Sequence, residues 1–152
     1  MQTRLLLALI TVMLSACGGD SSDGDEPNSP DQAPSAKALL FSADNGTDGA
    51  ELWASDGTEA GTEMVKNIYG TGGSSNPDDF FRIGETIFFQ AETAAEGKEL
   101  WKTDLTTGGT SLVKDINPGS GDSSPGDTFS VLDGTLYFAA NDGSSGRELW
   151  KS

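Results

Sequence analysis

One tripeptide recurs along this chain at a nearly constant interval, and it limits what the chain can fold into. The three copies are Glu51-Leu52-Trp53, Glu99-Leu100-Trp101 and Glu148-Leu149-Trp150. Their tryptophans are 48 and 49 residues apart, and each is preceded by a phenylalanine at twelve residues and a glycine at four. A period of this length falls in the range of four-stranded propeller blades. The sequence therefore predicts a tandem-repeat architecture.

Short runs of β-forming residues alternate with turn residues throughout the repeats. We expect ten strands, at residues 38–43, 50–55, 62–68, 79–83, 86–91, 98–103, 110–116, 128–132, 135–140 and 147–151. No part of the chain after the N-terminal apolar run keeps the 3.6-residue periodicity of a helix. A closed propeller needs about 4–8 blades. The expected fold is all-β, with antiparallel four-stranded propeller-blade-like repeats, about two and a half units, open rather than closed.

Short turns fix the register of the predicted hairpins. Asp133-Gly134 is typical of a type I′ turn, and Gly84-Glu85 fits type II′. Counting outward from these turns pairs the aromatic residues Phe129 with Phe138 and Phe80 with Phe89.

The same counting applies on either side of the loop at residues 56–61. The expected cross-strand partners are Trp53 and Met64, Leu52 and Val65, Glu51 and Lys66, Trp101 and Leu112, and Glu99 and Lys114. Glu51 and Glu99 would then each form an exposed ion pair with a lysine. The strands carry apolar residues on both faces, which predicts sheets covered on two sides. The repeated tryptophans are expected as buried wedges between neighbouring sheets.

Three segments resemble a known repeat family. ELWASDGTEAGT at 51–62, VKDINPGSGDSSP at 113–125 and LYFAANDGSSGRELWKS at 136–152 are similar to the bacterial ELWxxDGT repeat, a hyalin-like, β-propeller-type family of secreted and surface proteins. The resemblance covers about residues 39–152 and implies a fold but no defined activity. Two departures, Asp104-Leu105-Thr106 in the second copy and an end at Ser152 before a third Asp-Gly-Thr, suggest a truncated or partial member.

The N-terminal residues have the pattern of a lipoprotein signal peptide. Arg4 precedes the apolar run Leu5–Leu14, which is too short to span a bilayer. Leu14-Ser15-Ala16-Cys17 resembles a bacterial lipobox, which implies removal of residues 1–16 and acylation of the Cys17 thiol. Two or three acyl chains would anchor the protein stably. Gly18, where an aspartate would imply retention in the inner membrane, favours a location in the outer membrane.

An acidic segment separates the expected lipid anchor from the repeats. Residues 18–35 contain five acids, no base and one apolar side chain, Ala33. Such a composition cannot bury enough surface to offset the entropy of ordering. We therefore expect residues 17–37 to be a disordered, lipid-anchored tether and residues 38–152 to be the repeat region.

Composition excludes several classes of function. The chain has 24 acids, 9 bases and a net charge of −15, which argues against nucleic acid as a partner. Histidine is absent and cysteine occurs once, so the common general base and the activated serine and cysteine nucleophiles are lacking. The sequence thus predicts a protein that is not an enzyme and has no cofactor besides its covalent lipid. A calcium site at Asp44, Asp48 and Asn141 is an alternative to ordinary β-turn chemistry for these residues.

These observations lead to one expected function and two alternatives. The expectation is a lipid-anchored envelope or surface protein that contacts the membrane through Cys17 and binds a protein or glycan through its repeats. The alternatives are a truncated fragment of a longer array and a periplasm-facing scaffold of envelope assembly. Because an open stack leaves strand edges uncovered, self-association is also expected.

Overall fold

A computed structural model describes residues 39–126 and 128–152, which belong to the unit Ala33–Ser152. The sequence predictions for the signal peptide, Cys17 and the acidic tether lie outside these residues. The described residues form ten strands: β1 (Leu39–Asp44), β2 (Ala50–Ser55), β3 (Thr62–Lys66), β4 (Asp78–Ile83), β5 (Thr86–Thr93), β6 (Gly97–Thr103), β7 (Ser111–Lys114), β8 (Ser130–Leu132), β9 (Thr135–Asn141) and β10 (Arg147–Lys151). All ten were expected, with ends that differ by at most two residues. The prediction of an all-β fold is confirmed.

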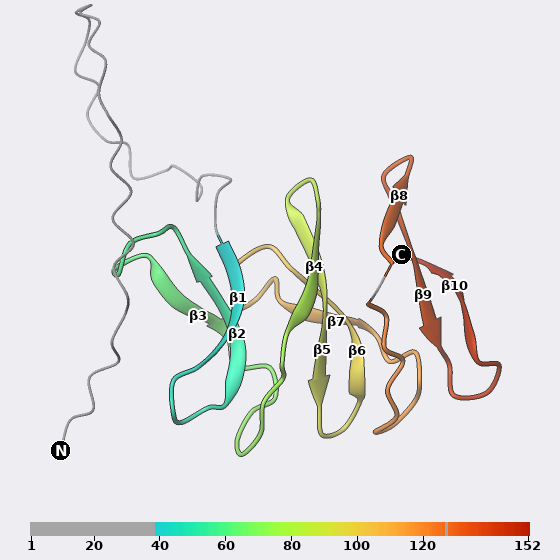
Figure 1. The fold of residues 1–152 in the computed structure, drawn as a ribbon, viewed down its shortest axis with the longest axis horizontal. Coiled ribbons are helices and arrows are strands. Elements are labelled where there is room, and N and C mark those ends of the chain that lie inside the picture. The colour runs from blue at the N-terminus through green and yellow to red at the C-terminus, as the bar shows by residue number, and fades with distance from the viewer. Residues whose placement is uncertain (1–38, 127) are drawn as a thin grey trace, which may run out of the picture. The chain divides into compact units, whose positions relative to one another are not determined.

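The strands form three antiparallel sheets, none of them closed (Figure 1). The first has the order β1-β2-β3, the second β4-β5-β6-β7 and the third β10-β9-β8, so every pair joins strands that are consecutive in sequence. Counting by period would have grouped the strands as four, four and two. The actual grouping of three, four and three arises because two-residue turns force β4 onto β5 and β8 onto β9, whereas long loops precede β4 and β8.

The two short turns set the registers that the sequence predicts. Ile83 pairs with Thr86 across the first turn and Leu132 with Thr135 across the second. Both central residues of the second turn have positive φ, 51° and 74°, as a type I′ turn requires.

The expected aromatic contacts flank these turns. The ring centroids of Phe80 and Phe89 are 5.7 Å apart, and those of Phe129 and Phe138 are 6.3 Å apart. A bulge in β4 places Asp79 and Phe80 together opposite Phe89, and Asp79 takes a φ of 54° there. The aromatic contact thus forms although the ladder is irregular at this point.

The register between β2 and β3 is only half as expected. Trp53 pairs with Met64, but a bulge then places Leu52 opposite Lys66, so Leu52 does not pair with Val65, nor Glu51 with Lys66. The second sheet repeats the pattern: Trp101 pairs with Leu112, and Leu100, not Glu99, pairs with Lys114. The predicted partners beyond the tryptophans are therefore wrong, because one extra residue in β3 and in β7 shifts the ladder.

Two hydrophobic clusters lie between consecutive sheets. The first joins Leu52, Val65 and Ile68 of the first sheet region to Phe89, Ala91 and Trp101. The second joins Leu100 and Ile116 to Leu136, Phe138 and Ala140. The β4–β7 sheet is therefore covered on both faces, as the apolar pattern predicts.

The tryptophans take part in this packing to different degrees. Trp101 is buried within the first cluster, as a wedge would be. Trp150 is only partly buried, against the second cluster, and its Nε1 donates to the Ala140 carbonyl at 3.2 Å. It is covered because the preceding sheet supplies Lys114, whose Nζ lies 4.9 Å from the centre of the Trp150 ring.

Candidate functional site

The most elaborate polar arrangement in the described residues surrounds the repeated glutamates. Glu51 and Glu99 lie in β2 and β6, and neither side chain is exposed to solvent. The expectation of exposed ion pairs with Lys66 and Lys114 is wrong for both. A buried carboxylate is costly unless its oxygens are hydrogen-bonded. The donors to each carboxylate show how this cost is offset.

The donors to Glu51 come from the loop that follows β3. Its Oε2 accepts a hydrogen bond from the Ile68 amide at 2.7 Å and from the Ser75 hydroxyl at 2.5 Å. Weaker bonds come from the Tyr69 amide to Oε2 at 3.4 Å and from the Ser75 amide to Oε1 at 3.2 Å. One carboxylate therefore holds both ends of an eight-residue loop segment.

Glu99 repeats this arrangement in the second sheet. Its Oε2 accepts from the Ile116 amide at 3.1 Å and from the Ser123 hydroxyl at 2.5 Å, and its Oε1 accepts from the Asn117 amide at 3.2 Å. Burial raises the pKa of the Glu99 carboxyl above its ordinary value of 4.5, against the lowering effect of these three hydrogen bonds. The negative Asp115 adds a smaller effect in the raising direction.

The two serines also connect consecutive sheets. The Ser75 carbonyl accepts from the Glu92 amide in β5 at 2.9 Å, and the Ser123 carbonyl accepts from the Asn141 amide in β9 at 3.0 Å. We call the pairs Glu51–Ser75 and Glu99–Ser123, with their loop amides, the glutamate–serine clips. Each clip fastens a loop to its own sheet and to the next.

Sequence reasoning missed Ser75 and Ser123, although a signal was present. Each lies 24 residues after its glutamate, so both obey the period of the repeat. The leucines of the motif behave as core residues in the first two copies, since Leu52 and Leu100 are fully buried, whereas Leu149 is 77% exposed. Glu148 is also exposed, and no clip forms around it in the described part of the chain.

The lysines that were expected to pair with the glutamates contact the following sheet. Lys66 donates from Nζ to the Thr110 carbonyl at 2.6 Å and to the Thr107 carbonyl at 3.4 Å. The bulge at Val65 leaves that residue's carbonyl free to accept from the Thr107 hydroxyl at 2.8 Å. The loop between β6 and β7 is thereby fixed to β3.

The aspartates of the repeat motif organise their own turns. Asp56 accepts from the Thr58 amide and hydroxyl at 2.9 and 2.7 Å, and Asp104 accepts from Thr106 in the same way at 2.9 and 2.6 Å. These hydrogen bonds lower the pKa of both aspartates. In the second copy Leu105 occupies the position of Gly57 and adopts a φ of 73°, close to the 92° of the glycine.

The candidate calcium ligands lie in similar turns. Asp44 accepts from the Gly46 amide at 2.6 Å and Asn141 from the Gly143 amide at 2.8 Å. Asp48 accepts from the side-chain amides of Asn45 and Asn67 at 2.7 and 3.1 Å. Asp44 and Asp48 share the β1–β2 turn, while Asn141 begins the β9–β10 turn. Among the described residues no group of three Asp, Glu, His or Cys side chains is placed to hold a metal ion.

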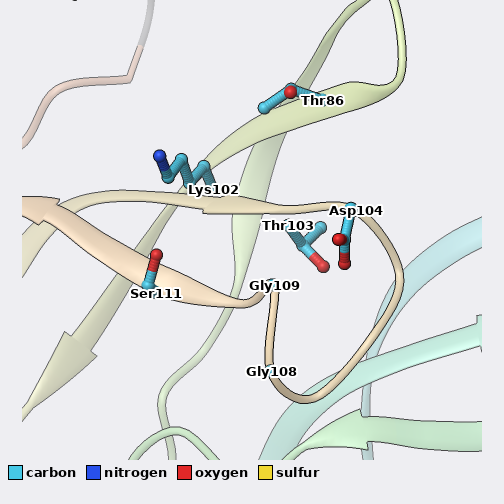
Figure 2. A pocket seen from close by; sticks show the side chains of 7 residues that line it. All are labelled: Thr86, Lys102, Thr103, Asp104, Gly108, Gly109 and Ser111. Atoms are coloured by element: carbon cyan, nitrogen blue, oxygen red, sulfur yellow. The ribbon is translucent and has the colours of Figure 1, made fainter.

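A pocket beside the β6–β7 loop is lined by Thr86, Lys102, Thr103, Asp104, Gly108, Gly109 and Ser111 (Figure 2). The Thr103 hydroxyl is hydrogen-bonded to the Thr110 hydroxyl at 2.7 Å, and the Asp104 carboxylate accepts a hydrogen bond from the Thr106 amide. The lowered pKa of Asp104 makes this carboxylate a weak base. The lining residues thus offer polar contacts to a ligand.

Comparison of the chain with protein-family models, with curated proteins and with solved structures gave no match. Within the part of the chain that is described, no helix has the length and apolar character needed to cross a membrane. Any function must therefore be argued from the residues themselves.

Proposed function

We propose that this protein is a lipid-anchored component of the bacterial cell envelope whose propeller-type repeats serve as a binding or scaffold module without catalysis. The fold supports this proposal through the β4–β7 sheet, which is antiparallel, four-stranded and covered on both faces, as a propeller blade is. This sheet is the observation that carries the repeat part of the proposal.

The glutamate–serine clips also favour a binding role. They hold the loops after β3 and β7 by hydrogen bonds to buried carboxylates, so these loops are fixed although they are rich in glycine and serine. Binding residues are often carried on loops that a rigid scaffold positions. A partner that contacts these loops would find a surface already ordered, which lowers the entropic cost of association.

The membrane part of the proposal depends on Cys17 and its lipobox. Cells expressing the wild type or Cys17→Ser would be grown with a palmitate analogue and the protein recovered. We expect label on the wild type and none on the variant, and the wild type should fractionate with the outer membrane. An unlabelled wild type, or a variant that keeps the label, would disprove the anchor.

Proteolysis of intact cells would locate the repeats. Cleavage by an added protease would support exposure at the cell surface, while protection that is lost when the outer membrane is permeabilised would indicate the periplasmic scaffold instead.

A further inference from the structure

The turn between β1 and β2 contains a reactive pair of residues. Asn45 precedes Gly46, and it is the only one of the six asparagines in the sequence that a glycine follows. The backbone nitrogen after an asparagine can attack the side-chain carbonyl, and glycine obstructs this attack least because it has no side chain. Asn45 and Gly46 are both exposed, and a Cβ added at Gly46 would meet no atom within 4 Å. The attacking nitrogen is therefore unhindered.

The hydrogen bonds of this turn suit such an attack. The Gly46 amide donates to Asp44 Oδ1 at 2.6 Å, so a carboxylate is placed to accept the proton of the attacking nitrogen. Asn45 Oδ1 accepts from the amides of Thr47 and Asp48, each at 2.9 Å, and two such donors stabilise negative charge that develops on this oxygen. Asp48 Oδ2 accepts from Asn45 Nδ2 at 2.7 Å and so holds the leaving nitrogen.

The third repeat shows that an aspartate fits at this position. Asp142 corresponds to Asn45, and its Oδ1 accepts from the amides of Ser144 and Ser145 at 2.8 and 2.7 Å. The amides of Ser145 and Ser144 lower the pKa of Asp142, so the turn favours a carboxylate there. An aspartate formed from Asn45 can therefore keep the contacts that the asparagine oxygen makes.

We propose that Asn45 is a site of spontaneous deamidation and that the β1–β2 turn promotes the reaction. The Gly46 nitrogen forms a bond to Asn45 Cγ as its proton passes to Asp44, and the carbonyl electron pair moves to Oδ1. When that pair returns, the bond between Cγ and Nδ2 breaks, and ammonia leaves with the proton from Asp44. Water then opens the cyclic succinimide to aspartate or isoaspartate, so the net reaction consumes one water and releases one ammonia.

The reaction would change a contact between this turn and the loop after β3. Asp48 accepts from Asn45 through Oδ2 and from the Asn67 side-chain amide through Oδ1 at 3.1 Å. An aspartate at position 45 has no proton to donate, and its charge would face the Asp48 carboxylate. The third repeat avoids this repulsion because Ser145 takes the place of Asp48. Deamidation would therefore weaken the attachment of the turn to the loop.

A variant with two asparagine–glycine turns tests the role of the carboxylate. Asp142→Asn places an asparagine before Gly143, whose amide donates to the neutral Asn141 Oδ1 at 2.8 Å. The full chain in detergent would be aged in neutral buffer, and peptide mapping by mass spectrometry would follow aspartate and isoaspartate at both positions. We expect position 45 to react about ten times faster than position 142 or more, because only position 45 has a general base.

Two further samples separate the turn from the pair of residues itself. Asp44→Asn keeps an oxygen for the Gly46 amide but removes the base, so it should slow the reaction at Asn45 about tenfold or more. The wild type unfolded in urea has the same pair of residues without the turn, and it should react more slowly than the folded protein. Circular dichroism would confirm that Asp44→Asn and Asp142→Asn are folded.

Four results would overturn the proposal. They are a folded wild type that stays unmodified at Asn45, a reaction at position 142 as fast as at position 45, an unchanged rate in Asp44→Asn, and an unfolded chain that reacts as fast as the folded one. If one variant does not fold, the other variant and the comparison with the unfolded chain still decide the question. None of these measurements involves the lipid anchor or a binding partner, so the result is independent of the function proposed above.

Discussion

Replacement of Glu99 by glutamine isolates the contribution of a clip to stability. The amide has the shape of the carboxylate, so no cavity is created. It offers one acceptor oxygen where the carboxylate offers two, and it places an N–H₂ group towards a backbone amide that also donates. In the best orientation the amide oxygen keeps the partners of Oε2, and the Asn117 amide is left facing a donor.

The expected loss follows from these contacts. A buried donor without a partner costs about 1–3 kcal/mol, and the remaining bonds weaken from charge-assisted to neutral. Relief of the desolvation penalty of the carboxylate offsets part of this loss. We expect Glu99→Gln to lower the free energy of unfolding by about 2–4 kcal/mol, which corresponds to a fall in Tm of roughly 10 °C for a domain of this size.

Urea and thermal unfolding of the full chain in detergent, followed by tryptophan fluorescence, would measure the effect. Glu51→Gln should lose a similar amount, since Glu51 has the same kind of partners. Glu148→Gln is the matched control, and its effect should stay within about 0.5 kcal/mol because Glu148 is exposed. If Glu99→Gln and Glu148→Gln have the same free energy of unfolding, the clip does not stabilise the fold and the reasoning is refuted.

Two further predictions concern the strained backbone at Leu105 and the raised pKa of Glu99. Leu105→Gly should raise the free energy of unfolding by up to about 1 kcal/mol, because leucine at a φ of 73° is strained where glycine is not. The reverse change in the first sheet, Gly57→Leu, should lower the free energy of unfolding by a similar amount through strain alone, since the added Cβ meets no atom within 4 Å. Urea unfolding would measure both effects, and a destabilised Leu105→Gly would contradict this reasoning. Because the pKa of Glu99 is raised on folding, its protonation stabilises the folded state at low pH, and this contribution is lost as the pH rises through the raised value. The stability of the wild type relative to Glu99→Gln should therefore increase in parallel melts as the pH is lowered from neutral through the raised pKa of Glu99, and a constant or decreasing difference would show that the pKa is not raised.

The strands and the tight hairpins could be predicted because their signals are local. Two residues decide the turn before Thr86 and the turn before Thr135, and the register follows by counting. The bulges at Val65 and Val113 could not be predicted in this way. Because these strands carry apolar residues on both faces, their sequence fits the register with the bulge as well as the register without it. Without these bulges, the predicted register placed Glu51 and Glu99 opposite lysines.

The position of the glutamates contradicts the general rule that charged side chains face solvent. The rule failed because the compensating donors are 17 to 24 residues away in sequence and come largely from backbone amides, which no residue type reveals. Only the serines carry a visible signal, since their constant distance from the glutamates makes them part of the repeating pattern.

The need for a carboxylate at this position follows from the loops that it holds. The segments after β3 and β7 consist mainly of glycine, serine, asparagine and proline, so they can bury little apolar surface of their own. An apolar side chain in place of Glu99 would leave the Ile116 and Asn117 amides without an acceptor and the Ser123 hydroxyl with only the more distant Lys98 carbonyl at 3.3 Å, whereas a carboxylate has about four lone-pair sites for these donors. The carbonyls of the same serines accept hydrogen bonds from backbone amides of the next sheet, so the carboxylate also stabilises the junction between sheets. Stability in such a chain is then approximately the sum of the stability of each sheet and of the junctions between neighbouring sheets, as in repeat proteins generally.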